Sequence, residues 1–147
     1  MFVRALLAFL LLPGIVAFAV PLLLGRDGQG QFNPLGLLPL VAGVVLLLWC
    51  VRDFYVAGKG TLAPWDPPRR LVVVGLYRWT RNPMYVAVAL ILIGWAVGYG
   101  ALWLWVYALA VVIAFHLRVV LFEEPWLGRT HGEEWVRYRA RVPRWLV

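Results

Sequence analysis

Residues 75–85 read Gly-Leu-Tyr-Arg-Trp-Thr-Arg-Asn-Pro-Met-Tyr, and they lead into an apolar segment that begins at Pro83. Asn82 followed by Pro83 is typical of a helix start, because Asn can cap free amide groups and Pro fits the first helical position without losing a hydrogen bond. A helix N-terminus also favours an anion. We therefore expect Arg81 and Tyr85 to face one pocket at the membrane surface.

A less specific interpretation fits the same residues. Arg78 and Arg81 could bind lipid phosphate, while Tyr77, Trp79 and Tyr85 form an aromatic belt. Taken alone, this stretch favours the interpretation as lipid-binding arginines within an aromatic belt. A second polar cluster, forty residues later, is needed before it indicates a site.

The composition is that of an integral membrane protein. Of the 147 residues, 63% are hydrophobic and only 14% are charged, which no soluble domain of this size needs. Four apolar segments, at about 2–24, 35–51, 83–97 and 101–122, approach or exceed the ~20 residues that cross a bilayer. We expect an all-α fold of about four transmembrane helices, with a tight antiparallel hairpin at 98–100.

The distribution of basic residues predicts the orientation. The first segment could be a signal peptide, since Arg4 precedes it and residues 17–19 resemble a cleavage site, but its apolar run to Leu24 is too long for a typical signal. With four spans, only Arg26 of the fourteen Lys and Arg residues lies on one side. The positive-inside rule then places both termini in the cytoplasm.

Several functions are not supported. The formal charge of +7 comes from membrane-proximal arginines that would orient the chain and meet anionic lipid, so it does not indicate nucleic-acid binding. Cys50 is the single cysteine, and packing is its expected role. His116 and His131 are too dispersed for a metal site, and no phosphate-binding glycine motif is present. We expect neither a metal nor a nucleoside triphosphate.

The chain divides near Val51. Residues 1–51 form two spans with few polar side chains, so we expect packing and lipid contact there and no chemistry. Residues 52–147 hold a Gly- and Pro-rich connector, a helical hairpin and a tail. We expect this second part to bind the ligands.

The polar cluster after the last apolar segment is His116 with Glu123 and Glu124. His116 and Glu123, seven residues apart, share one helical face. The two acids, followed by Pro125, are expected to end the helix, where they oppose its dipole and approach the bilayer; a charge costs roughly 3 kcal/mol at mid-span and less near the interface. A cationic ligand or an arginine must offset that cost. The available arginines are Arg118, Arg129, Arg137 and Arg141.

The tail at 132–141 predicts an amphipathic helix, with Trp135 and Tyr138 on one face. Such a helix would lie on the membrane surface or fold over the site. On its own it indicates an interfacial helix only.

In order and spacing, these motifs resemble the bacterial isoprenylcysteine carboxyl methyltransferase-like and phospholipid methyltransferase-like membrane enzymes. The resemblance covers roughly the second half of the chain. Its elements are the stretch 75–85, His116, Glu123-Glu124, Gly132, Tyr138 and Val142-Pro143-Arg144, with Gly60-Thr61 and Pro67-Pro68 in the connector. Two positions depart from it: His131-Gly132 replaces the usual Phe-Gly, and Asn82 replaces the His of the eukaryotic carboxyl methylating enzymes.

The resemblance implies a small helical enzyme that binds S-adenosylmethionine between the last two spans, the preceding loop and the C-terminal helix. The acid pair could balance the sulfonium and ammonium, Arg81 or Arg78 could hold the carboxylate, and an aromatic ring could contact the adenine. The implied catalytic residues are Arg81, Glu123 and Glu124. The candidate cofactor-binding residues are Tyr77, Arg78, Arg81, Asn82, Pro83, Tyr85, His116, Glu123, Glu124 and Tyr138.

We therefore predict an S-adenosylmethionine-dependent methyltransferase of the bacterial inner membrane, with its site on the cytoplasmic side. The acceptor would be lipophilic: an isoprenylcysteine-like carboxylate, a phospholipid amine or another small hydrophobic molecule entering from the bilayer. Two alternatives stay open. One is an NADPH-dependent sterol-type reductase, in which Arg69-Arg70 could meet the extra phosphate. The other is a non-enzymatic lipid-interacting scaffold whose acids pair with tail arginines.

Overall fold

The computed structural model describes residues 10–25, 31–53, 56–57 and 71–146, and within these ranges it contains helices and no strand. The all-α fold class is confirmed. The longest helices are α3 (Leu37–Asp53), α4 (Pro83–Tyr99) and α5 (Leu102–Arg118). The shorter elements are a π-helix η1 (Leu10–Ala19), α2 (Val20–Gly25), the 3-10 turns η2 (Pro34–Gly36) and η4 (Gly75–Arg78), a π-turn η5 (Val119–Glu123), α6 (Glu124–His131) and α7 (Glu133–Arg141).

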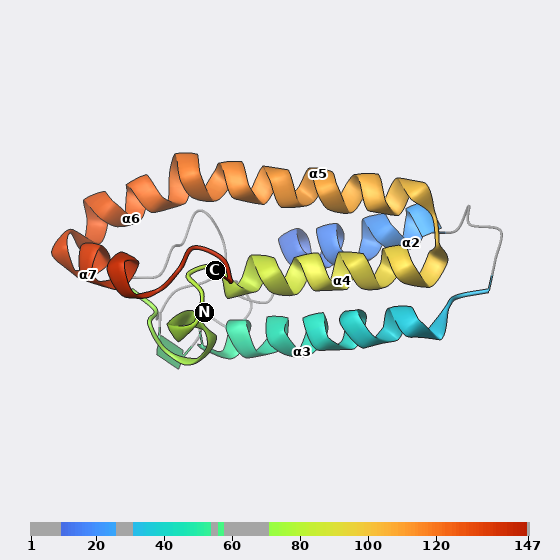
Figure 1. Cartoon of the computed structure of the whole chain (residues 1–147), viewed down its shortest axis with the longest axis horizontal. Helices are drawn as coiled ribbons and strands as arrows, with labels where there is room; N and C mark the ends of the chain where they lie inside the picture. Colours follow the sequence, from blue (N-terminus) through green and yellow to red (C-terminus); the bar gives the residue numbers. More distant parts are fainter. Residues whose placement is uncertain (1–9, 26–30, 54–55, 58–70, 147) are drawn as a thin grey trace.

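Helix α4 is the centre of the bundle. It contacts α3, α5 and α2, and the long helices run side by side with α6 and α7 gathered at one end (Figure 1). Its side chains Ile91 and Leu92 are almost fully buried, together with Leu47 of α3. The central helix of the bundle is therefore the one that begins with the Asn82-Pro83 motif.

Two helical runs are long and apolar enough to cross a membrane, Pro34–Asp53 and Leu102–His131. The apolar helices Pro13–Gly25 and Pro83–Tyr99 are shorter. Large apolar side chains face outward on both long runs, including Leu38 and Trp103, as expected of surfaces in contact with lipid tails. The number of four spans stays a prediction.

Two aromatic side chains form hydrogen bonds that join the first described helix to the bundle. Trp95 Nε1 donates to the carbonyl of Ala17 at 2.8 Å, and the Tyr107 hydroxyl donates to the carbonyl of Val16 at 2.9 Å. Ala17 itself is fully buried. The first apolar segment therefore contributes to the core.

Glycines bring α3 and α4 together. A Cβ placed on Gly43 would lie 2.7 Å from the carbonyl oxygen of Ala87, and one on Gly94 would lie 2.6 Å from the backbone nitrogen of Leu40. Real side chains do not approach so closely, so the two backbones pack almost in contact. Small residues at such crossings are typical of helices that associate in a membrane.

The predicted hairpin is confirmed, but the predicted helix end at Glu123 and Glu124 is wrong. Gly100 ends α4 in a left-handed conformation with φ 65°, and α5 follows after one further residue. At its other end α5 continues through η5 into α6. The π-turn closes with a hydrogen bond from the Glu124 N–H to the Val119 carbonyl, and Pro125 follows it in the first turn of α6.

Candidate functional site

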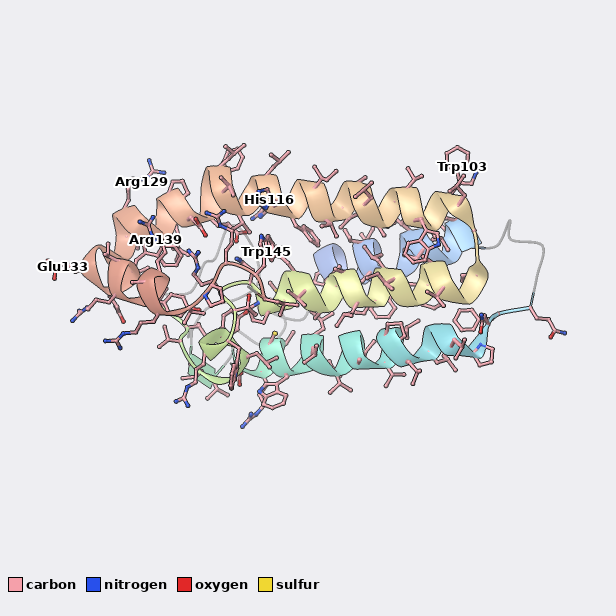
Figure 2. The ribbon with its side chains drawn as sticks, viewed as in Figure 1. Trp103, His116, Arg129, Glu133, Arg139 and Trp145 are labelled. Atoms are coloured by element: carbon pink, nitrogen blue, oxygen red, sulfur yellow. The ribbon has the colours of Figure 1, made fainter. Side chains whose placement is uncertain are left out.

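Most of the predicted site residues lie at the end of the bundle where α4 begins and α6 and α7 pack. Figure 2 shows His116 and Trp145 turned toward one another there, with Arg129, Glu133 and Arg139 further out and Trp103 at the opposite end. This convergence joins residues up to 64 positions apart in the chain.

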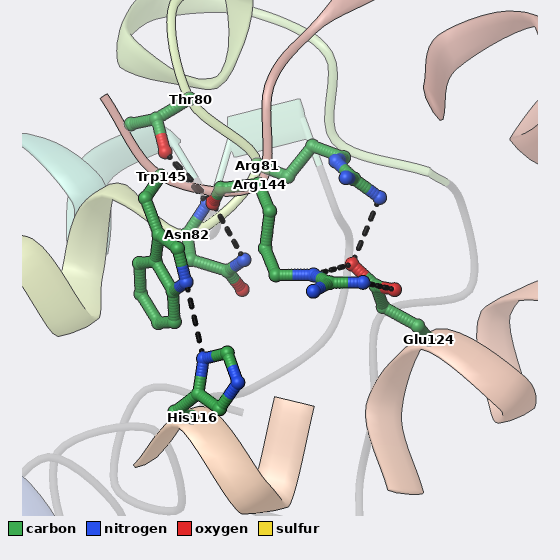
Figure 3. Close-up of polar contacts among 7 residues, drawn as sticks. All are labelled: Thr80, Arg81, Asn82, His116, Glu124, Arg144 and Trp145. Carbon is green, nitrogen blue, oxygen red and sulfur yellow. Dashed lines mark hydrogen bonds and ion pairs between the residues drawn. The ribbon is translucent and has the colours of Figure 1, made fainter. Parts of the chain in front are cut away.

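Glu124 holds two arginines. Arg81 Nη1 donates to Glu124 Oε1 at 2.8 Å, and Arg144 donates through Nε to Oε1 and through Nη2 to Oε2, both at 2.8 Å (Figure 3). The side chains of Arg81 and Glu124 are 9% and 11% exposed. Two guanidiniums and one carboxylate leave this cluster with one surplus positive charge.

The protonation state of the arginines follows from their surroundings. Burial lowers the pKa of the Arg81 guanidinium below its usual value, although the charge of Glu124 opposes this shift. The hydrogen bond to Glu124 raises the pKa of Arg144. The ordinary pKa of an arginine is far above neutral, so both guanidiniums remain charged near neutral pH.

Residues 142–146, which we call the C-terminal strap, cross the start of α4. The backbone N–H of Arg81 donates to the Pro143 carbonyl at 2.9 Å. The Arg144 carbonyl accepts from Thr80 Oγ1 at 3.1 Å and from Asn82 Nδ2 at 2.9 Å. The strap thereby carries the Arg144 side chain to Glu124.

The role expected for Asn82 as a helix cap is wrong in part. Asn82 occupies the N-cap position and Pro83 follows it in the first turn, as predicted, but the Asn82 side chain makes no capping hydrogen bond. Its amide is used by the strap instead. The tertiary contact has replaced the local one that the sequence pattern favours.

Glu123 belongs to a separate group. Its Oε1 accepts a short hydrogen bond from the Tyr85 hydroxyl and another, at 2.7 Å, from Arg118 Nε. The Tyr85 ring packs against Phe115 with the ring centres 4.5 Å apart. The side chains of Glu123 and Arg118 are 31% and 45% exposed, so this pair is far more open to solvent and ligand than the Glu124 cluster.

His116 contacts the strap. Its Nδ1 accepts a hydrogen bond from Trp145 Nε1 at 3.3 Å, and the two rings stack with centres 6.0 Å apart. An accepting Nδ1 carries no proton, so in a neutral ring the proton is on Nε2. His116 therefore contacts the strap through the side chain of Trp145.

Helix α7 turns its aromatic face inward. Trp135 and Tyr138 are buried in one cluster with Val142, and the Arg81 guanidinium lies over the Trp135 ring at 5.4 Å. The Tyr138 hydroxyl donates to the Tyr77 carbonyl at 2.7 Å. Burial raises the pKa of both tyrosines, so both phenols are neutral. The helix therefore packs against the residues at the start of α4, and its expected roles, lying on the membrane surface or folding over the site, stay predictions.

Sequence reasoning missed part of this arrangement. Thr80, Trp145 and Arg144 contact the predicted residues but were not among the expected site residues. The Val-Pro-Arg motif at 142–144 was the available signal for Arg144. Arg78, which was expected in the site, is exposed, and no described contact joins it to the Glu124 cluster.

The chain belongs to the phospholipid methyltransferase family, whose model it matches over residues 33–134. This confirms the family resemblance and places the chain among membrane methyltransferases. The matched range includes Arg81, Glu123 and Glu124 and ends before the strap. No curated protein and no solved structure matched the chain.

Proposed function

We propose that this protein is an S-adenosylmethionine-dependent methyltransferase that modifies a lipophilic acceptor at the cytoplasmic face of a membrane. Family membership supports the reaction class, and the Arg81–Glu124–Arg144 cluster supports the cofactor site. The proposal keeps the division made from the sequence, with residues 1–51 as packing and residues 52–147 as the ligand-binding part.

The surplus charge of the cluster suits the carboxylate of the cofactor. Arg81 Nε is buried and has no hydrogen-bond partner among the described residues. A buried donor without a partner costs about 1–3 kcal/mol, so a ligand that accepts from it is favoured. Glu124 would hold the two guanidiniums in place, with Trp135 beneath Arg81.

The aromatic side of the site suits the rest of the cofactor. Tyr77, Tyr85 and Tyr138 are neutral rings near the start of α4, next to Asn82 and Pro83, and can contact an adenine. Glu123 is the more exposed acid, and its Arg118 partner is also exposed. We assign Glu123 the role of accepting the proton of an amine acceptor.

Bound S-adenosylmethionine would supply an electrophilic methyl group on a positively charged sulfur. Methyl transfer is an in-line displacement, so the residues of this site have to align donor and acceptor and exclude water. We assign both tasks to helix α7 and the strap. A carboxylate or thiolate acceptor needs no base, whereas an amine must first lose a proton.

A ligand titration tests the proposal against its alternatives. Purified protein in lipid nanodiscs should bind S-adenosylmethionine and S-adenosylhomocysteine, and not NADPH. A reductase would prefer NADPH, and a scaffold would bind none of the three. Labelled methyl donor, followed by untargeted lipid analysis, should then reveal a methylated lipid; binding without any labelled product would contradict the proposed activity.

We predict that Arg81→Lys lowers methyl transfer about tenfold. Lysine keeps the charge but loses the planar, multiply donating head group that Arg81 uses between Glu124 and the Trp135 ring. The matched control is Arg78→Lys, in the same stretch but exposed, which should leave the rate unchanged. Equal rates for wild type and Arg81→Lys would favour a role in binding lipid phosphate only.

We predict that residues at the two ends of the bundle lie on opposite faces of the membrane. In a Cys50→Ala background, Arg78→Cys and Thr130→Cys should react with an impermeant thiol reagent from the cytoplasm, and Gln31→Cys from outside. All three native side chains are exposed. Reaction of Arg78→Cys and Thr130→Cys from opposite faces would contradict both the orientation and the shared site.

A further inference from the structure

Most acids in the described part of the chain already have an evident role or lie in solvent. Glu133 and Glu134 are exposed on α7. Glu123 is bonded to Tyr85 and Arg118, and Glu124 to two arginines. Asp53, the last residue of α3, is different because it is buried.

The carboxylate of Asp53 is poorly compensated within the described residues. The residue is 7% exposed, and its Oδ2 has no hydrogen-bond partner there. Its Oδ1 lies 3.7 Å from Arg52 Nη1, but the Arg52 side chain is 73% exposed. An ion pair with so exposed a partner contributes at most about 1 kcal/mol to stability, which is too little to offset the cost of burying the carboxylate charge.

The backbone makes room for this carboxylate. Gly75, the first residue of η4, has a φ of 56°, and a Cβ at this position would overlap Asp53 Oδ2. The same Cβ would lie 3.3 Å from Trp49 Nε1. Any other residue at 75 would displace the acid, so the glycine that opens the stretch 75–85 fits a carboxylate held in this place.

Asp53 also lies close to the candidate site. The pKa of Tyr77 is raised mainly by burial and further by the charges of nearby groups, among them Asp53, Tyr138 and Tyr85. The Tyr77 carbonyl is bonded to Tyr138, and Tyr85 to Glu123. Asp53 thus contacts Gly75 at the start of η4, and Tyr77 in the same turn is bonded to Tyr138 of the site.

We propose that Asp53 binds a positively charged group of a bound ligand, either the sulfonium or ammonium of the methyl donor or the ammonium of an amine acceptor. The inference rests on the proposed function. A buried carboxylate with an unpartnered oxygen is costly alone and favourable beside a cation. Of the acids first expected to meet this cation, Glu124 uses both oxygens to hold arginines, and Glu123 is bonded to Tyr85 and Arg118 and is partly exposed. Asp53 differs from both because it is buried and its Oδ2 has no described partner.

Asp53→Asn tests the inference, because it removes the charge and keeps the shape. Without ligand, the variant should unfold at the same or a higher temperature than wild type, since an uncompensated charge has been removed. The control Arg52→Gln, which removes the exposed partner, should leave ligand affinity unchanged. If Asp53→Asn does not fold, Asp53→Ser replaces it, measured in the same way.

Three measurements on Asp53→Asn distinguish the possible ligands. At least tenfold weaker binding of S-adenosylmethionine, with S-adenosylhomocysteine little affected, assigns Asp53 to the sulfonium. An equal loss for both assigns it to the donor ammonium, which they share. Unchanged donor binding, with at least a tenfold higher KM for phosphatidylethanolamine in vesicles, assigns it to the acceptor.

Two results would overturn the inference. One is unchanged affinity for both donors together with an unchanged KM. The other is a lower unfolding temperature with the ligand-induced shift intact, which would make Asp53 a structural residue only. Failure of wild type itself to bind either donor would instead contradict the proposed function, so the two failures are distinguishable.

Discussion

Glu124→Gln should lower the rate of methyl transfer about 100-fold or more. A loss of about 100-fold corresponds to about 2.7 kcal/mol of lost transition-state stabilisation. The change keeps the shape of the side chain but leaves Arg81 and Arg144 side by side without the carboxylate that joins them. Their mutual repulsion should detach the C-terminal strap. Donor affinity and rate, measured on the purified variant, should fall together.

The same substitution should also destabilise the protein. Removing one partner of a buried ion pair costs ~3–5 kcal/mol, and we expect the lower end because the Arg144 side chain is 35% exposed. Glu133→Gln, on the exposed face of α7, is the matched control and should change neither stability nor rate. An active and equally stable Glu124→Gln would show that the cluster is dispensable.

Gly94→Val should separate α3 from α4 and prevent the bundle from folding. Its Cβ would lie 2.6 Å from the Leu40 nitrogen, which is backbone and cannot move aside. Overpacking of this kind costs about 1–3 kcal/mol in a core that can adjust, and more where it cannot. We expect little monodisperse protein after extraction in detergent. Ala110→Val, on the exposed surface of α5, adds a larger side chain without such a contact and should be extracted as well as wild type.

The sequence predicted the helices well because their signals are local. Apolar length located α3, α4 and α5 to within a few residues, and Gly100 marked the turn between the last two. The same local reasoning failed at Pro125, which reads as a helix stop. The π-turn that precedes it accommodates the proline, and nothing in the apolar pattern signals a π-turn.

The site was predicted in its residue types more than in its contacts. Arg81 pairs with Glu124, and Tyr85 with Glu123, in two separate groups, and these partners depend on long-range geometry. Pairing Glu124 with Arg144 required knowing that the strap returns to the start of α4. Asp53 could not be recognised from sequence, because a single acid at the end of a span reads as an interfacial charge until its burial is known.

The π-turn η5 sets the rotational phase of everything that follows it. It closes with a bond between residues five apart, so it holds one more residue than an α-turn, and each residue of a helix advances the side-chain direction by about 100°. If the same residues wound as an uninterrupted α-helix, every residue after the turn would be rotated about the helix axis. Glu123 and Glu124 would then point about a quarter-turn away from Tyr85 and Arg81. A substitution at 119–122 that favoured an α-turn over the π-turn would thus disable the site while leaving each of its side chains chemically intact.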